Sequence, residues 1–220
     1  MLREVAHFVR HAPAVLRLKA KLPQEQLYQT LMERMDAAGL GDQRSQLVAD
    51  LRGDVVEIGS GTGIMFPHYH RDARVSAIEP DAAFRELSLA KATPNISVTD
   101  GTGEALPFPD GSFDTAVLAL VLCSVSSPRS VLTEVRRVLR PRGQVRLIEH
   151  VRSPRRAAGW LMDRIDPLWL KINAQGCHLN RDPLPALEDA GFEVTSVEPF
   201  QVYSAGIPAF PMRRITAAAR

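Results

Sequence analysis

The sequence is poor in cysteine, has little surplus charge and lacks a long uncharged apolar run. It holds two cysteines in 220 residues, which excludes a disulfide framework and suits a reducing compartment, so we expect a cytoplasmic protein. The formal net charge is +2, and no basic run is interleaved with aromatic residues, so nothing indicates a nucleic-acid partner. Charged residues interrupt the segment from Met1 to Leu22, which argues against a signal peptide and against a membrane span.

Apolar periodicity divides most of the chain into alternating helices and strands. Helices are expected at residues 1–23, 24–38, about 43–51, 63–70, 81–92 and 128–140. Short apolar runs predict strands at residues 54–58, 75–79, 96–99, 113–120 and 144–150, with a loop over 100–112 and a turn at 141–143. This α/β alternation predicts a mostly parallel sheet with helices on both faces.

The last third of the chain follows a different pattern. Residues 154–182 contain Pro167, which is expected to break any long helix, and we interpret this stretch as an inserted cap. A helix is expected at about 183–190 and strands at 191–199 and 213–219, of which the last is antiparallel and completes a seven-stranded sheet. We therefore expect one domain over residues 1–220, with N-terminal helices in 1–52, a ligand-binding core in 53–150, and a substrate cap and C-terminal strands in 151–220.

The main chemical signal is the run Val55 to Gly63, which reads VVEIGSGTG. Its glycines allow a sharp turn from strand to helix and a close approach of the backbone to a ligand. A dinucleotide-binding turn has the spacing G-x-G-x-x-G, whereas this chain has G-x-G-x-G, with Ile64 in the place of the third glycine. Glu57, before the first glycine, would repel a pyrophosphate but can hold the ammonium group of an amino-acid-bearing cofactor, directly or through water.

A second acid follows the next predicted strand. Glu79 stands before Pro80 and lies 20 residues beyond Gly59, where an acidic side chain hydrogen-bonds both hydroxyls of a ribose. A carboxylate can accept two such bonds at once. A lone acid at a strand end is as often a solvated side chain, but the combination with Glu57 and the glycines favours a nucleoside-binding site.

Several segments together resemble a known family. They are the run Glu57 to Gly63, Glu79, the segment GTGEALPFPDGSFD at 101–114 and the segment RVLRPRG at 137–143. Over residues 50–150 the chain resembles the class I S-adenosylmethionine-dependent methyltransferases, most of all the ubiquinone and menaquinone biosynthesis branch. The segments LVLCSV at 120–125, EHV at 149–151 and GCHL at 176–179 resemble a methyltransferase-like group that includes small-molecule thiol methyltransferases.

The resemblance implies a Rossmann-like fold, S-adenosylmethionine as cofactor and S-adenosylhomocysteine as product. It also implies cofactor-binding positions. The methionine and ribose parts would contact Glu57, Gly59, Ser60, Gly61 and Gly63, and the ribose would also contact Glu79 and Pro80. The adenine would lie beside Thr102, Gly103 and Glu104, and the Leu120 backbone would contact the amino-acid end. One departure is that many relatives have Asp-Ala where this chain has Thr102-Gly103. The usual carboxylate for the adenine amino group is therefore missing, and either the Thr102 hydroxyl or Glu104 has to replace it.

The sequence predicts proton transfer by histidine and no metal site. The six histidines and two cysteines lack a paired-cysteine zinc spacing, and a sulfonium methyl group needs no metal for activation. His150, at the carboxyl end of a predicted strand, is the first candidate for a general base, and His178 is the second. For both histidines a purely structural role is the alternative, and Cys123 and Cys177 are expected to be buried and inert.

The acceptor is expected to be a small, apolar molecule that offers a thiol, hydroxyl, amine or carbon nucleophile. This expectation comes from the large apolar residues of the cap, which can line an apolar pocket or simply cover the sheet. The basic segment Leu2 to Leu22 is interpreted as a lid or packing helix rather than as a contact with a membrane surface. A phospholipid N-methyltransferase and a non-catalytic S-adenosylmethionine-binding protein stay open as alternatives, an NAD-dependent oxidoreductase is disfavoured by Glu57 and the glycine spacing, and the oligomeric state is left open.

Overall fold

A computed structural model describes residues 19–173, 176–204 and 209–220. Within them one sheet has the order β3-β2-β1-β4-β5-β7-β6, in which β1 to β5 are parallel and β7 is antiparallel to both of its neighbours. The strands are β1 (Gly53–Ile58), β2 (Ala73–Ile78), β3 (Ile96–Thr99), β4 (Phe113–Ala119), β5 (Leu139–His150), β6 (Phe192–Gln201) and β7 (Pro211–Ala219). The predicted seven-stranded sheet with an antiparallel last strand is confirmed.

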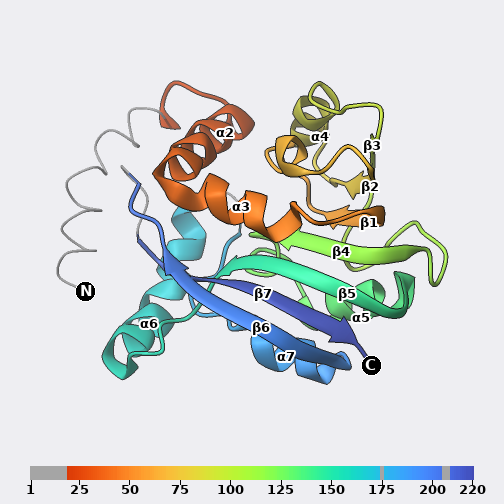
Figure 1. Cartoon of the computed structure of the whole chain (residues 1–220). Coiled ribbons are helices and arrows are strands. Elements are labelled where there is room, and N and C mark those ends of the chain that lie inside the picture. The colour runs from red at the N-terminus through yellow and green to blue at the C-terminus, as the bar shows by residue number, and fades with distance from the viewer. Residues whose placement is uncertain (1–18, 174–175, 205–208) are drawn as a thin grey trace.

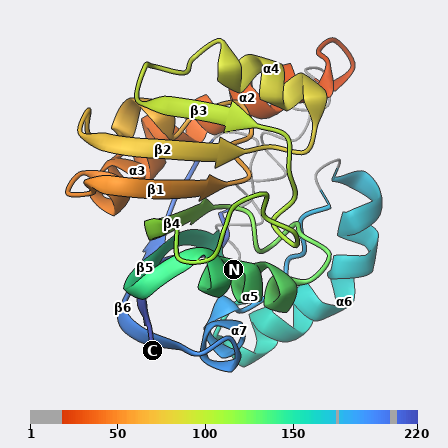
Figure 2. The same ribbon diagram turned by 90° about the vertical axis from the view of Figure 1, so that its right-hand side faces the viewer.

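Helices cover both faces of this sheet (Figures 1 and 2). The helices α2 (Gln24–Met35), α3 (Gly41–Val48) and α4 (Ala82–Leu89) lie on one side, and α5 (Pro128–Val138) and α7 (Pro183–Asp189) lie on the other. The helix α6 (Arg156–Ile172) lies beyond the carboxyl end of β5, where the cap was expected. The predicted helix 1–23 lies almost entirely outside the described residues.

The central strand β1 shows why its sequence is apolar without alternation. Val56 and Ile58 pack into the core beneath α5 and α7, whereas Val55 packs into the core beneath α2 and α3. Both faces of the strand are therefore covered, as is usual for a parallel sheet. Glu57 shares the face of Val55, so a carboxylate is buried where an apolar side chain would pack at lower cost.

Two local predictions are wrong because of backbone geometry. The expected helix 63–70 is only a short 3₁₀ turn, Phe66–His68, since Gly63 has a positive φ of 72° at its start and Tyr69 is already extended, with a ψ of 142°. The expected turn at 141–143 lies inside β5, which begins at Leu139. There the register with β4 shifts, and Arg142 takes a positive φ of 65°, so the segment forms a bulge rather than a strand boundary.

The expectation that Pro167 breaks any long helix is also wrong, since α6 continues through it to Ile172. Proline removes one backbone donor and disturbs the preceding turn. The adjacent Asp166 offsets this disturbance by joining α6 to the segment that follows it. Its carboxylate accepts hydrogen bonds from the Leu179 backbone N–H at 2.6 Å and from His178 Nδ1 at 2.9 Å.

Gly63 and Gly111 offer a matched test of crowding at the glycine turn. Both have positive φ, 72° and 61°, but a Cβ at Gly63 would lie 3.0 Å from the Phe66 ring and 3.1 Å from the Ser88 Cα, whereas a Cβ at Gly111 meets nothing within 4 Å. We expect Gly63→Ala to reduce the free energy of unfolding by about 1–3 kcal/mol more than Gly111→Ala does, because only the first adds overpacking to backbone strain. Urea unfolding of both variants measures the difference, and equal losses would contradict the expectation.

Candidate functional site

The predicted site residues gather at one edge of the sheet, where the carboxyl ends of the parallel strands meet. Glu57 lies near the end of β1, Glu79 follows β2, Leu120 follows β4 and His150 ends β5. The strand order changes direction between β1 and β4, and open α/β sheets bind ligands in the crevice at such a point. The residues singled out in the sequence are thus brought together.

The turn after β1 runs close to the loop after β4. Gly59 has a positive φ of 69°, and a Cβ there would approach the Val121 side chain to 3.0 Å, so only glycine fits without displacement of its neighbour. Ser60 donates its backbone N–H to the Ile78 carbonyl at 3.0 Å, which fixes the turn against the end of β2. Gly61, with a φ of 55°, follows directly.

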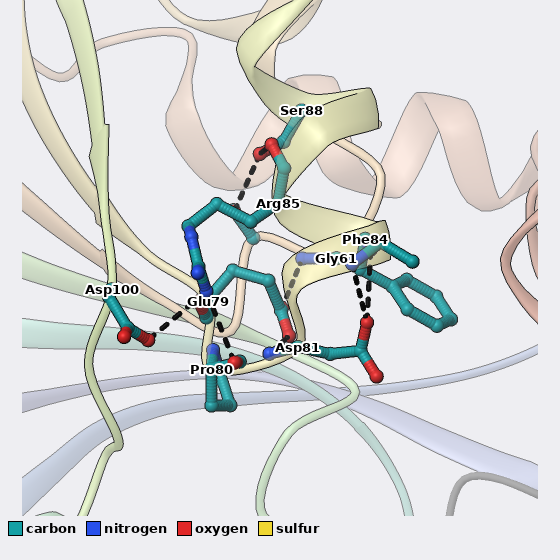
Figure 3. Close-up of polar contacts among 10 residues, drawn as sticks. Gly61, Glu79, Pro80, Asp81, Phe84, Arg85, Ser88 and Asp100 are labelled. Atoms are coloured by element: carbon teal, nitrogen blue, oxygen red, sulfur yellow. Dashed lines mark hydrogen bonds and ion pairs between the residues drawn. The ribbon is translucent and has the colours of Figure 1, made fainter.

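Glu79 braces this turn from the neighbouring strand (Figure 3). Its carboxylate accepts the backbone N–H of Gly61 at 2.8 Å through Oε2 and that of Asp81 at 3.0 Å through Oε1. Arg85, from α4, donates to the Glu79 and Pro80 carbonyls at 2.6 and 3.1 Å. Burial raises the pKa of Glu79, and the two backbone donors oppose only part of that rise. Each oxygen keeps a second lone pair, as acceptance of ribose hydroxyls would require.

Glu57 is the most unusual group at this edge. Its residue is 2% exposed, and its Oε2 has no hydrogen-bond partner among the described residues. Burial raises the pKa of this carboxyl to about 8, opposed in part by the Tyr69 hydroxyl and the Arg44 guanidinium. Arg44 is itself buried and bonds Asp36 Oδ1 at 2.9 Å. A buried carboxylate oxygen with spare capacity fits the predicted role of accepting from an ammonium group or its water.

Tyr28 is a neighbour of the glycine turn that the sequence did not reveal. It comes from α2, and its ring lies 3.6 Å from the position that a Cβ on Gly61 would take, in an edge contact with Phe84 at 5.4 Å between centroids. Removal of the hydroxyl from water raises the pKa of Tyr28 to about 12. Periodicity assigned α2 a packing stripe of Leu27, Leu31 and Met35, whereas Tyr28 packs against the core together with Met32 and Met35. The N-terminal helices thus contribute to the site as well as to the core.

On the predicted adenine side, Glu104 is engaged by the protein itself. Its Oε1 accepts from the Ser126 hydroxyl at 2.7 Å and from the Ser126 backbone N–H at 3.1 Å. Burial alone would raise the pKa of Glu104, but these hydrogen bonds hold it below its usual value. Gly103 is buried against Ile58 and Val131, whereas Thr102 is exposed. Of the two replacements considered for the missing carboxylate, the Thr102 hydroxyl is therefore the more available.

The loop after β4 is held by a carboxylate that sequence reasoning left without a role. Leu120 has a φ of 63°, which is unusual for a residue other than glycine, and donates its N–H to the Ile148 carbonyl at 2.7 Å. The next two N–H groups, of Val121 and Leu122, donate to Glu149 Oε1 at 2.8 and 2.7 Å. Glu149 is buried, which raises its pKa. Glu149 was visible only as part of the segment EHV.

His150 lies against both cysteines of the chain. Its Nε2 is 2.6 Å from Cys177 Sγ, and one ring nitrogen and the two sulfurs lie within 4.8 Å of one another. Burial lowers the pKa of His150, but the nearby Cys123 thiol and the Glu149 carboxylate more than reverse this, so the pKa is raised. Cys123 is buried as expected, whereas Cys177 is partly exposed.

His178, the second predicted base, has a different environment. Its Nδ1 is paired with the buried Asp166 at 2.9 Å, and its backbone N–H donates to the Cys123 carbonyl at 2.8 Å. These contacts hold the end of the cap against the loop after β4. A positioning role is thus supported for His178 by its contacts, and its catalytic role stays a prediction.

The apolar cap residues do not all face the site. Met162 is buried, whereas Trp160, Ile165 and Leu168 are exposed, the last by 64%. The expectation that this cluster lines an acceptor pocket therefore does not hold for these three side chains. No helix among the described residues is long and apolar enough to span a membrane.

Two surface hollows lie elsewhere. One of about 520 Å³ is lined by Arg136, Arg142 and Arg220, and one of about 360 Å³ is lined by Asp50, Arg52 and Gly143. Both are at the end of β4 and β5 opposite His150, and neither includes a predicted site residue.

Comparison with known proteins shows what the chain is similar to. A family described as "Methyltransferase domain" matches residues 56–147. Thiol S-methyltransferase TMT1B of Rattus norvegicus is 34% identical over 163 residues, which cover 69% of this chain and 66% of the relative. The chain thus spans slightly less than two thirds of the length of this curated relative.

Two bacterial enzymes match shorter stretches at 31% identity. One is the demethylmenaquinone methyltransferase of Renibacterium salmoninarum, and the match covers 52% of this chain and 51% of that enzyme. The other is the phosphatidylethanolamine N-methyltransferase of Cereibacter sphaeroides, and the match covers 44% of this chain and 51% of that enzyme. The crystal structure of the Bacillus subtilis YcgJ protein superimposes with a TM-score of 0.66 at 16% identity, and the match covers 86% of this chain and 99% of that one. These findings confirm both resemblances seen in the sequence and the fold.

The buried Glu57 predicts a stability that falls with rising pH. The folded-state pKa of about 8 exceeds the ordinary value of 4.5, so the folded protein retains a proton that the unfolded chain releases between these values. The stability present below pH 4.5 is therefore lost progressively up to about pH 8. We expect Glu57→Gln to be more stable than the wild type by more than about 1 kcal/mol at pH 8, with a smaller difference at pH 5.

Glu134→Gln is the control with the opposite sign. Its hydrogen bond to Arg137 lowers the pKa of Glu134, so loss of that carboxylate should destabilise the protein at both pH values. Denaturant unfolding at pH 5 and pH 8 measures both variants. A Glu57→Gln variant that is less stable than the wild type at pH 8 would refute the prediction that burial of the ionised Glu57 carboxylate destabilises the folded protein.

Proposed function

Because the chain belongs to the class I S-adenosylmethionine-dependent methyltransferase family, we propose that it transfers a methyl group from S-adenosylmethionine to the sulfur of a small thiol. The observation that carries the proposal is the 34% identity to a thiol S-methyltransferase over 69% of the chain, which extends beyond the cofactor-binding core. His150, the proposed base, ends β5, and Cys177 Sγ lies against its Nε2, so the Cys177 side chain has to move aside for an acceptor sulfur to reach that nitrogen.

The residues at the strand ends fit the cofactor in two ways. Glu57 has a buried carboxylate oxygen without a partner among the described residues, which suits the ammonium group. Glu79 keeps lone pairs for the ribose hydroxyls while it holds Gly61 in place. The methyl group of S-adenosylmethionine is bonded to a sulfonium, which makes it electrophilic, and S-adenosylhomocysteine is the product.

The task left to the protein is to position and deprotonate the acceptor. A thiol is a weak nucleophile until it loses its proton, and His150 is placed at the sheet edge to accept that proton. The acceptor sulfur then forms a bond to the methyl carbon as the bond from that carbon to the sulfonium breaks. Positioning for this in-line approach supplies several kcal/mol of the barrier reduction. The proton leaves His150 to solvent, and a neutral thioether is formed.

A phospholipid N-methyltransferase is the second candidate, favoured by the match to the enzyme of Cereibacter sphaeroides. An amine acceptor needs the same sheet edge but would be presented at a membrane surface.

The predicted cytoplasmic location, the absence of a nucleic-acid partner and the division into core and cap also stay predictions.

Loss of the Glu79 carboxylate should weaken cofactor binding. Each hydrogen bond to an ionised group contributes roughly 1.5–3 kcal/mol, so we expect Glu79→Ala to raise the Kd for S-adenosylmethionine by roughly 10-fold or more. Asp100→Asn is the control, because Asp100 is an exposed acid that pairs with Arg85 on the same surface. Calorimetric titration measures both variants, and an unchanged Kd in Glu79→Ala would show that the ribose is bound elsewhere.

An acceptor panel tests the proposed reaction. Labelled S-adenosylmethionine is incubated with an alkyl thiol, a phenol, an amine and vesicles that contain phosphatidylethanolamine, and methylated product is counted. We expect the alkyl thiol to be preferred and His150→Gln to lower its turnover roughly 100-fold. An acidic aromatic thiol, ionised before it binds, should lose much less activity in that variant.

Two other results of the acceptor panel would contradict the proposed thiol methylation. Preference for the vesicles would replace the proposal with the phospholipid activity. Cofactor binding without turnover of any acceptor would favour a non-catalytic binding protein.

A further inference from the structure

Three side chains with metal-binding atoms converge at the carboxyl end of β5, and one of them is the proposed base His150. Cys123 comes from the loop after β4, His150 ends β5, and Cys177 follows α6. The two sulfurs and one imidazole nitrogen lie within 4.8 Å of one another. Cys177 lies 27 positions beyond His150 in the sequence, so the cluster does not have the short spacing between ligands that is typical of a zinc motif. The expectation of no metal site followed from that spacing, before folding brought the three together.

The separation of these atoms is close to what a tetrahedral cation requires. With Zn–S bonds of about 2.3 Å, two sulfur ligands of a tetrahedral zinc stand roughly 3.8 Å apart. The widest of the three separations, at most 4.8 Å, exceeds this value by about 1 Å, whereas the 2.6 Å between His150 Nε2 and Cys177 Sγ is shorter than two ligands of one cation allow. Binding therefore requires side-chain rotation that brings one pair of atoms together and moves the other pair apart. Thiolate and imidazole are also the ligand types that zinc and its thiophilic relatives prefer.

The backbone around both cysteines is fixed before any cation binds. The Asn173 side chain accepts the Cys177 backbone N–H at 3.0 Å through Oδ1 and donates to the Cys177 carbonyl at 2.9 Å through Nδ2. The Cys123 carbonyl accepts the His178 backbone N–H at 2.8 Å. The two sulfurs are thus presented from anchored segments rather than from free loops.

We propose that Cys123, His150 and Cys177 form a binding site for one thiophilic divalent cation, for which Zn²⁺ is the probe. Binding releases the two thiol protons to solvent, and the two resulting thiolates neutralise the cation. The imidazole nitrogen that binds the cation can no longer accept a proton from the acceptor. Occupancy therefore stops methyl transfer, a consequence that rests on the proposed function.

Cobalt substitution tests the site without any turnover. The full chain has only these two cysteines, so any cobalt–thiolate charge-transfer absorption has to come from this cluster. With both thiols shown to be reduced by thiol titration, we expect one Co²⁺ per chain, a charge-transfer band, and its loss when Zn²⁺ displaces the cobalt. Absence of stoichiometric binding, or binding without the band, would overturn the proposal.

Single-ligand variants supply the matched comparison. Cys177→Ser, at a partly exposed position, and Cys123→Ser, at a buried one, should each weaken Co²⁺ binding at least about 100-fold and reduce the band. His70→Gln is the control, since His70 lies on the surface beside Asp72 and should leave binding unchanged. Undiminished Co²⁺ affinity in both cysteine variants would show that the cluster is not the site.

Methyl-transfer assays test the consequence separately. One equivalent of Zn²⁺ should abolish transfer by the wild-type protein, a chelator should restore it, and residual transfer by Cys177→Ser should become insensitive to Zn²⁺. Full activity of the zinc-loaded wild type would overturn the proposed block of His150. An acceptor other than a thiol would refute the proposed function and leave the cobalt result standing, because the spectrum does not depend on turnover.

Discussion

Two buried carboxylates hold the two loops that follow β1 and β4, the central pair of strands. Each carboxylate lies at the end of the strand beside that pair, β2 on one side and β5 on the other. Glu79, after β2, accepts the Gly61 N–H from the turn after β1. Glu149, in β5, accepts the Val121 and Leu122 N–H groups from the loop after β4. Since β1 and β4 are the two central neighbours at which the strand order reverses, these bonds fix both walls of the crevice. Hydrogen bonds to ionised acceptors are strong enough to hold irregular backbone in one conformation.

At the same edge of the sheet, the burial of one acidic side chain, Glu57, costs folding free energy, and packing alone does not explain why an acid is there. Glu57 occupies a core position on β1, and its raised pKa records the work of burying its charge. Arg44 lies nearby, but its direct hydrogen bond goes to Asp36, and the Glu57 Oε2 has no partner among the described residues. An apolar residue would stabilise this fold better. This cost is what we expect if Glu57 is the proposed binding group, maintained at the expense of stability.

The sequence predicted the parts of the fold that depend on local pattern. The run Val55 to Ile58 is apolar because both faces of β1 are covered, and Gly59 and Gly61 carry the positive φ values that a sharp turn requires. The prediction failed where tertiary contacts overrode local preference. Pro167 lies within α6, whose Asp166 is bonded to the chain beyond the helix.

The candidate site was predictable only where its residues belong to contiguous segments. Glu57 and Glu79 follow from their places at strand ends. Glu149 could not be assigned, because its partners are backbone N–H groups 27 and 28 residues away. Tyr28 was missed for a similar reason, since its neighbour Gly61 is distant in the chain and helical periodicity cannot tell a core residue from one that also contacts the site.

Arg181 joins the segment after α6 to the sheet edge that carries His150. Arg181 donates to the Leu122 and Val125 carbonyls at 2.6 and 2.7 Å, and its own carbonyl accepts the Arg152 N–H at 2.9 Å. These bonds tie the segment after α6 to the loop after β4 and to the end of β5. Because that loop is already fixed by Glu149, the two sulfurs and His150 belong to one connected hydrogen-bonded unit. An acceptor bound beside His150, as proposed, would contact this unit, whereas the cofactor half of the crevice is held separately by Glu79.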